Sequence, residues 1–174
     1  MLACIAVVLV LGLNGLAITA NADEGSRGTT KVLLVRHAEK GNDPKNDPDL
    51  KKPGGENRAK KLAEVTFKAD VRAIYTTNTN RTRQTVQPLA KALNLQPVIY
   101  DSTAWLVSDI ITKHQGESVL VAGHSNTVPD IIKALGGDPR CCPIDDQFDN
   151  LCIIVIFAAG KAEVIHLKYG DPSP

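Results

Sequence analysis

Residues 31–40 read KVLLVRHAEK, and this stretch decides the fold that the sequence predicts. Its apolar part, residues 32–35, is short, continuous and β-rich, which is typical of a strand buried on both faces of a sheet. Arg36 and His37 follow that strand directly. In open α/β sheets, ligands bind beyond the carboxyl ends of the parallel strands. The stretch therefore predicts a central strand and marks the edge of the sheet at which function is expected.

Strand-like and helix-like segments alternate along the chain after this first strand. Further strands are expected at 71–75, 97–100, 118–122, 151–158 and 162–167. Helices are expected at 56–66, 81–93, 105–114 and 128–135. Because strands that alternate with helices build βαβ units, we predict an α/β fold. Its expected form is a three-layer αβα sandwich, with a mostly parallel sheet of about six strands and helices on both faces.

The overall composition excludes some classes of function. The chain has 174 residues, of which 43% are hydrophobic and 22% are charged, as in ordinary globular domains. Lys and Arg together number 20, and Asp and Glu number 19, so the formal net charge is only +1. A chain so near neutrality has no general attraction for nucleic acid or for a membrane surface. We therefore expect no nucleic-acid partner, and any affinity for anions must come from a local cluster.

The first 22 residues, MLACIAVVLVLGLNGLAITANA, contain no charged side chain. Their apolar core is shorter than the ~20 residues of a membrane-spanning helix, and small residues precede a cleavage point after Ala22. We expect a signal peptide at 1–22, a linker at 23–30, a domain at 31–170 and a tail at 171–174. The expected location is periplasmic or secreted, without stable membrane insertion after cleavage. An uncleaved anchor helix or a first strand is the alternative, because no Lys or Arg stands near Met1.

Three cysteines follow the predicted signal peptide: Cys141, Cys142 and Cys152. In an oxidising compartment, Cys152 is expected to form a disulfide with either Cys141 or Cys142, since adjacent cysteines rarely bond to each other. A zinc site is the alternative, but this spacing lacks a nearby histidine. We therefore predict a disulfide and no metal.

Polar residues follow four of the predicted strands. They are Arg36 and His37 after 31–35, Arg81 and Arg83 after 71–75, Asp101 after 97–100, and His124 after 118–122. Since the carboxyl ends of parallel strands share one edge of the sheet, these side chains are expected to converge. Arginine offers a planar fork that matches two phosphate oxygens, and the helix beginning near Asn126 adds backbone N–H donors. This pattern is typical of an oxyanion-binding pocket.

Three segments resemble the histidine phosphatase superfamily, which includes the cofactor-dependent phosphoglycerate mutases. They are VLLVRHAEK at 32–40, AIYTTNTNRTRQTVQPLA at 73–90 and VLVAGHSNTVP at 119–129. The resemblance implies that His37 is a nucleophile that forms a phosphohistidine, and that Arg36 and Arg81 hold the phosphoryl oxygens. It also implies that His124 hydrogen-bonds the phosphoryl group, with neither a metal nor another cofactor. Arg81 is preferred to Arg83 because Arg81 aligns with the arginine of the family motif.

Chemistry adds a condition on His37 that does not depend on the family. An imidazole attacks phosphorus through an unprotonated nitrogen, so its other nitrogen must donate a hydrogen bond, and a backbone carbonyl is an expected acceptor. Asn126, near the start of a helix, is a candidate further contact for phosphate. Asn42 is another candidate, as the counterpart of an asparagine that the family places a few residues after the histidine.

The proton donor for the leaving group is the least defined part of the predicted site. Asp101 is one candidate, because mutases of the family place a glutamate shortly after the third strand. Glu39, two residues after His37, is the other. Where acid phosphatases of the family follow the second histidine with aspartate, this chain has Ser125. A third alternative is that no strong acid exists and that the substrates have good leaving groups.

These features together predict a metal-independent phosphatase that hydrolyses phosphomonoesters or phosphoramidates. No long insertion follows the third predicted strand to cover the pocket. We therefore expect a small phosphorylated substrate or a phosphorylated surface group as the partner. A phosphoglycerate mutase-type phosphoryl transferase and a phosphate-binding pseudoenzyme are the alternatives.

Overall fold

The computed structural model describes residues 28–42, 47–158 and 161–173. The predicted signal peptide at 1–22 and the first part of the linker at 23–30 lie outside these residues. In the part of the chain that is described, no helix is both long and apolar enough to cross a bilayer.

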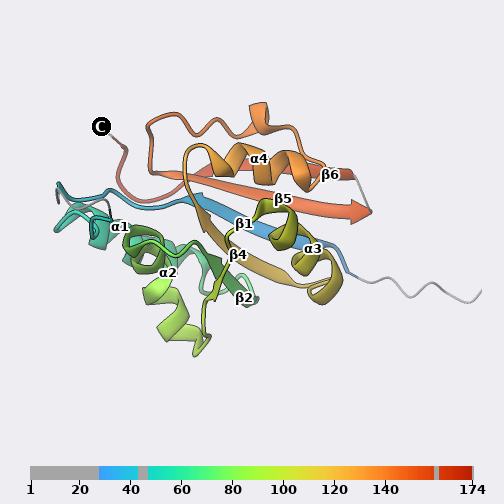
Figure 1. Cartoon of the computed structure of the whole chain (residues 1–174), viewed down its shortest axis with the longest axis horizontal. Helices are drawn as coiled ribbons and strands as arrows, with labels where there is room; N and C mark the ends of the chain where they lie inside the picture. The colour runs from blue at the N-terminus through green and yellow to red at the C-terminus, as the bar shows by residue number, and fades with distance from the viewer. Residues whose placement is uncertain (1–27, 43–46, 159–160, 174) are drawn as a thin grey trace, which may run out of the picture.

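A six-stranded sheet forms the centre of the described structure (Figure 1). Its strands are β1 (Thr30–Arg36), β2 (Val71–Thr76), β3 (Val98–Ile99), β4 (Ser118–Gly123), β5 (Asn150–Ala158) and β6 (Lys161–Lys168). Along the sheet they lie in the order β3-β2-β4-β1-β5-β6. The first four are parallel, whereas β5 and β6 form an antiparallel hairpin beside β1. The predicted, mostly parallel sheet is confirmed.

Helices cover both faces of the sheet. On one face, α1 (Gly54–Thr66) and α2 (Asn80–Leu93) contribute Leu62, Val86 and Leu89 to a hydrophobic core. On the other, α3 (Thr103–Lys113) and α4 (Thr127–Ala134) contribute Leu106, Ile110 and Ile131. A 3₁₀ turn, Pro139–Cys141, precedes the loop that leads into β5. The three-layer αβα sandwich is therefore confirmed.

The apolar run at 32–35 lies in the middle of the sheet, between β4 and β5. Val32 and Leu34 pack against the core of α3 and α4, while Leu33 and Val35 pack against the core of α1 and α2. None of these side chains is more than 4% exposed. Burial on both faces explains why the run shows no alternation of polar and apolar residues.

A disulfide joins Cys142 to Cys152. The sequence left either Cys141 or Cys142 as the partner of Cys152, and the structure has Cys142. Cys141 is exposed and free. Cys152 lies in β5, opposite Leu34 of β1. The disulfide therefore ties the loop before β5 to a strand next to the one that carries Arg36 and His37.

Candidate active site

The ends of β1 and β4 bring the two motif histidines together. Arg36 pairs with Gly123 in the sheet, and the backbone N–H of His37 donates to the carbonyl of Gly123 at 2.9 Å. The ring centroids of His37 and His124 lie 5.4 Å apart. A side chain at Gly123 would not fit, because its Cβ would lie 2.8 Å from Oγ1 of Thr127. The approach of the two turns thus depends on glycine at this position.

A cavity of about 360 Å³ lies at this edge of the sheet. Its lining residues follow β1 and β4 or begin α2: Arg36, His37, Lys40, Arg81, His124, Ser125 and Asn126. The structure therefore brings the predicted arginines and histidines together with Asn126. Asn42 is exposed and is not among the lining residues. Arg83 lines a different cavity, which agrees with the preference for Arg81.

His37 is only 5% exposed. Its Nδ1 lies 2.8 Å from the carbonyl oxygen of Ala38. Because a carbonyl only accepts hydrogen bonds, Nδ1 carries the proton, and Nε2 of the neutral ring keeps its lone pair. Burial lowers the pKa of His37 to about 4, and the charges of His124, Arg81 and Arg36 act in the same direction. The expected carbonyl acceptor is present, and the ring is neutral near pH 7.

His124 is partly buried, and both of its ring nitrogens contact side chains. Nε2 lies 2.9 Å from Oγ1 of Thr77, and Nδ1 lies 3.4 Å from Nη2 of Arg81. Arginine only donates, so Nδ1 accepts from Arg81 and Nε2 of the neutral ring donates to Thr77. Burial lowers the pKa of His124, the charges of Arg81 and Arg36 lower it further, and Asp47 opposes them. His124 is therefore a hydrogen-bonding group whose ring contacts side chains rather than backbone.

Arg36 is held by neutral groups. Its Nη1 donates to the carbonyl of Asp145 at 2.9 Å, and its Cζ lies 4.3 Å from the ring centroid of Phe148. Its Nε is buried and has no hydrogen-bond partner among the described residues. Burial lowers the pKa of Arg36 and the charge of Asp146 opposes this, but a guanidinium stays protonated in proteins. A buried cationic donor without a partner favours an anion at this position.

Arg81 reaches the cavity from the first turn of α2. Its Nη1 lies 3.5 Å from a carboxylate oxygen of Asp47. The same carboxylate accepts from the backbone N–H of Asn80, with distances of 2.9 and 3.0 Å to its two oxygens. Asp47 therefore satisfies a free N–H at the start of α2 and orients Arg81 at the same time.

Glu39 does not line the cavity but forms an ion pair with Arg58, which is only 6% exposed. Oε1 of Glu39 lies 2.6 Å from Nη2 and 2.9 Å from Nε of Arg58. Burial works to raise the pKa of Glu39, but the hydrogen bonds from Arg58 lower it. A carboxylate held ionised in this way is a poor general acid, which corrects the expectation that Glu39 donates the proton. Asp101 is exposed beyond β3 and does not line the cavity either.

The backbone around His37 is fixed by residues that are distant in the sequence. The N–H of Ala38 donates to Oγ1 of Thr85 in α2 at 2.9 Å. Arg58, the partner of Glu39, also donates to the carbonyl of Tyr169 at 3.0 Å. The turn that carries His37 is thereby tied to α1, to α2 and to the segment after β6.

Four residues that contact the predicted site were not singled out from the sequence: Asp47, Thr77, Thr85 and Phe148. Thr77 and Thr85 lie within the family-like segment at 73–90, and Thr77 also stands in the polar run TTNTN at 76–80. Asp47 and Phe148 lie in loops, and their contacts depend on how those loops fold back over the sheet.

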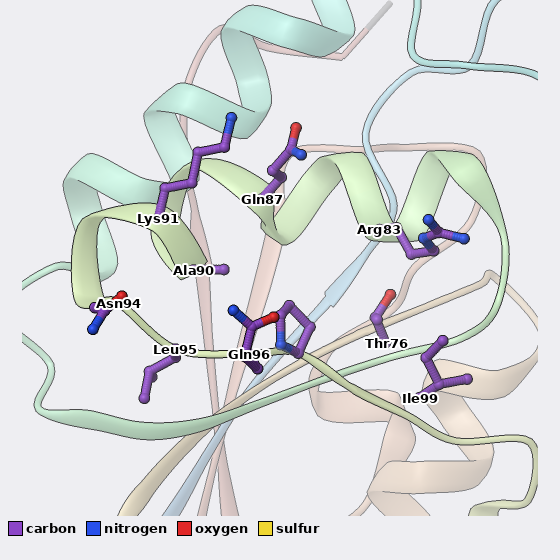
Figure 2. Close-up of a pocket in the computed structure, with 10 residues that line it drawn as sticks. Thr76, Arg83, Gln87, Ala90, Lys91, Asn94, Leu95, Gln96 and Ile99 are labelled. Carbon is purple, nitrogen blue, oxygen red and sulfur yellow. The ribbon is translucent and has the colours of Figure 1, made fainter.

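A larger cavity, of about 620 Å³, lies beside α2 and β3. Figure 2 shows Arg83, Thr76 and Ile99 at one end of it and Lys91, Asn94 and Leu95 at the other. No histidine or carboxylate lines this cavity. The smaller cavity around His37 is therefore the one with groups suited to nucleophilic and acid–base chemistry. Among the described residues, no cluster of His, Cys, Asp and Glu side chains is arranged to hold a metal ion.

Comparison with known families agrees with the residues found at this edge of the sheet. The family model described as "Histidine phosphatase superfamily (branch 1)" matches residues 32–104. The matched segment contains Arg36, His37 and Arg81, and His124 lies beyond it. Residues 32–104 are therefore similar to the histidine phosphatase superfamily over the segment that holds three of these four residues. No curated protein sequence is detectably similar to it.

Solved structures share the fold at low sequence identity. A protein described as the phosphohistidine phosphatase SixA of Agrobacterium tumefaciens is 19% identical, with a TM-score of 0.59, covering 82% of this chain and 98% of that one. The protein histidine phosphatase SixA in complex with tungstate is 16% identical, with a TM-score of 0.61 and coverages of 82% and 96%. A mycobacterial glucosyl-3-phosphoglycerate phosphatase is 12% identical, with a TM-score of 0.62 and coverages of 81% and 98%. These identities establish a shared fold, not a shared substrate.

Proposed function

We propose that the chain is a phosphatase that takes the phosphoryl group of its substrate onto Nε2 of His37 and then releases it to water. The observation that carries this proposal is the contact between Nδ1 of His37 and the carbonyl of Ala38. Because the carbonyl only accepts hydrogen bonds, the contact fixes the tautomer with the proton on Nδ1 and the lone pair on Nε2. Because burial lowers the pKa of His37 to about 4, the ring is in its nucleophilic form at neutral pH.

The reaction has two balanced steps. In the first, Nε2 bonds to phosphorus, the bond from phosphorus to the leaving group breaks, and that group departs with its electron pair and takes up a proton. In the second, water bonds to phosphorus, the P–N bond breaks, inorganic phosphate leaves, and Nε2 recovers its lone pair. Phosphoryl transfer is accelerated chiefly by fixed positive groups around the equatorial oxygens. We assign this role to the guanidinium groups of Arg36 and Arg81, with the neutral ring of His124 as a hydrogen-bonding group and Asn126 as a further contact.

We propose that a metal ion is not needed, since two guanidinium groups already supply positive charge in the cavity. We further propose that the preferred substrates have good leaving groups, such as phosphoramidates and aryl phosphates. This preference is supported by the described lining of the cavity, which includes no carboxylate to act as a general acid. The names of two solved structures with this fold, both SixA proteins, also favour phosphohistidine as a substrate.

The test is hydrolysis of p-nitrophenyl phosphate and of phosphohistidine by the purified chain in the presence of EDTA. We expect turnover by the parent chain, none by His37→Ala, and full turnover by the control His166→Ala. His166 lies in β6, where its Nε2 is 2.7 Å from Oδ1 of Asn150. With radiolabelled substrate, the parent chain should carry acid-labile phosphate that His37→Ala lacks.

Each other outcome of this test indicates a different function for the chain. Phosphate binding without hydrolysis of either substrate would identify a pseudoenzyme. Interconversion of phosphoglycerates that depends on a bisphosphate primer would identify a mutase. Activity that EDTA abolishes would overturn the proposed metal independence.

We also propose that the chain is exported, with residues 1–22 as a signal peptide. The disulfide between Cys142 and Cys152 supports this, because such bonds persist in oxidising compartments. Sequencing of the secreted or periplasmic protein should begin at Asp23. Recovery of an intact Met1 in the cytosol would contradict export.

A further inference from the structure

The loop between α4 and β5 is anchored on both sides of a short span that lies against Arg36. On one side, Cys142 is disulfide-bonded to Cys152, and Ile144 is buried in the core of α3 and α4. On the other, the carboxylate of Asp149 accepts from Nζ of Lys168 at 3.0 Å and from Oγ of Ser173 at 3.1 Å. The span at 145–148 is therefore held between two fixed points.

Within this span, Phe148 is held at its backbone and contacts the site through its ring. Its N–H donates to Oγ of Ser173 at 2.7 Å. Its ring centroid lies 4.3 Å from Cζ of Arg36 and 5.8 Å from the ring centroid of His37. The ring therefore covers Arg36 and adjoins His37, although it does not line the cavity itself.

The contact with the ring adds a restraint on the guanidinium of Arg36. The hydrogen bond to the carbonyl of Asp145 restrains only Nη1 of Arg36, and Nε has no partner among the described residues. A ring whose centroid lies 4.3 Å from Cζ limits how far the guanidinium can turn, and with it the direction of the remaining N–H groups. The ring carries no charge, so the charge of Arg36 stays available for an anion, whereas Arg81 faces the carboxylate of Asp47.

We propose that Phe148 is a positioning residue of this phosphatase, which acts by holding Arg36 in the orientation that receives the phosphoryl group. The proposal rests on the proposed function, in which Arg36 binds phosphoryl oxygens. A side chain that is ordered before binding loses less freedom when the anion arrives, so Phe148 strengthens phosphate binding without touching the phosphate.

The test compares Phe148→Leu, which keeps the apolar bulk and removes the aromatic face, with Phe148→Tyr, which keeps both. Inorganic phosphate is titrated into the full chain by calorimetry. We expect Phe148→Leu to bind phosphate about tenfold more weakly, the size expected for a stacked cation and one ordered side chain. Phe148→Tyr should stay within about twofold of the parent. Phe157→Leu is the matched control, because Phe157 lies in β5 and is 60% exposed.

A second readout separates positioning from a loss of fold. The Nε–H of Arg36 should give an NMR signal shifted by the nearby ring and identified by its absence in Arg36→Lys. That signal should move in Phe148→Leu and return in Phe148→Tyr. Phe148→Met replaces Phe148→Leu if thermal melting shows that the leucine variant does not fold.

Three results would overturn the proposal: phosphate affinity of Phe148→Leu within twofold of the parent, an Arg36 signal that does not move, or a tyrosine variant as weak as the leucine one. Weakened phosphate binding with a moved signal, in a chain that hydrolyses nothing, would support Phe148 and overturn the proposed phosphatase activity instead.

Discussion

His37 and His124 face the same cavity, yet they are restrained in different ways. His37 is buried, and its ring hydrogen bond goes to the carbonyl of the next residue, Ala38. His124 is partly buried, and its ring contacts are side chains, Thr77 and Arg81. A ring held by backbone keeps one tautomer, whereas a ring held by side chains can exchange its partners when an anion enters. The comparison indicates that two histidines in one cavity can differ in role because their rings are hydrogen-bonded to different kinds of group.

The largest expected effect is the loss of His37. We expect His37→Ala to lower kcat by at least ~10⁴-fold on p-nitrophenyl phosphate, because the covalent route is removed rather than slowed. Steady-state assays with circular dichroism as a check on folding would measure this. Retention of more than about one per cent of the activity would place the nucleophile elsewhere.

Loss of His124 should be smaller. His124→Ala removes one donor to the transferring group but leaves Nε2 of His37 intact, so kcat should fall by ~10²–10³-fold. In this variant, labelled phosphate should still accumulate on His37, which acid-lability and peptide mapping would check. If the label is instead found on His124 of the parent chain, the two roles are reversed.

Proton affinity should report the burial of the His37 ring directly. Burial holds the pKa of His37 at about 4, against an ordinary value of 6.5, so its NMR titration should have a midpoint near 4. The unfolded chain takes up this proton near pH 6.5 and the folded chain does not, so the free energy of unfolding should decrease as pH falls from 6.5 toward 4. Urea unfolding at pH 7 and pH 4.5 would measure this. A His37 midpoint at 6.5 or above would contradict both statements.

The smallest expected effect concerns the support behind His124. Thr77→Val removes the acceptor of Nε2 but keeps the shape of the side chain, so kcat/KM should fall by about three- to tenfold, equivalent to one hydrogen bond. The control is Thr112→Val on α3, an exposed threonine whose hydroxyl bonds only its own helix. An equal loss in both variants would mean that His124 does not depend on Thr77.

The sequence predicts much of the fold because several of its signals are local. The apolar run at 32–35 identifies β1 without reference to any other residue, and helical spacing identifies α2. Residues that follow such strands must meet at one edge, so Arg36, His37 and His124 were predictable as neighbours. Arg81 needed the family motif, because spacing alone does not separate it from Arg83, which lies two residues further along the same helix.

The rest of the site was not predictable because it depends on contacts between distant segments. Glu39 stands beside the nucleophile turn, and only the folded chain pairs it with Arg58 of α1. Phe148 lies 112 residues from Arg36 in the sequence. Its place against that side chain follows from a loop closed by the disulfide and by Asp149. A local sequence pattern does not indicate which distant residues will come into contact.

The turn that carries His37 depends on a residue more than a hundred positions further along the chain. Glu39, beside the nucleophile turn, pairs with Arg58, and Arg58 donates to the carbonyl of Tyr169. During translation, His37 and every other motif residue therefore leave the ribosome before that carbonyl does. A nascent chain that stops short of Tyr169 contains all the predicted catalytic side chains on an incomplete scaffold. We therefore expect catalytic activity to begin only after Tyr169 has left the ribosome.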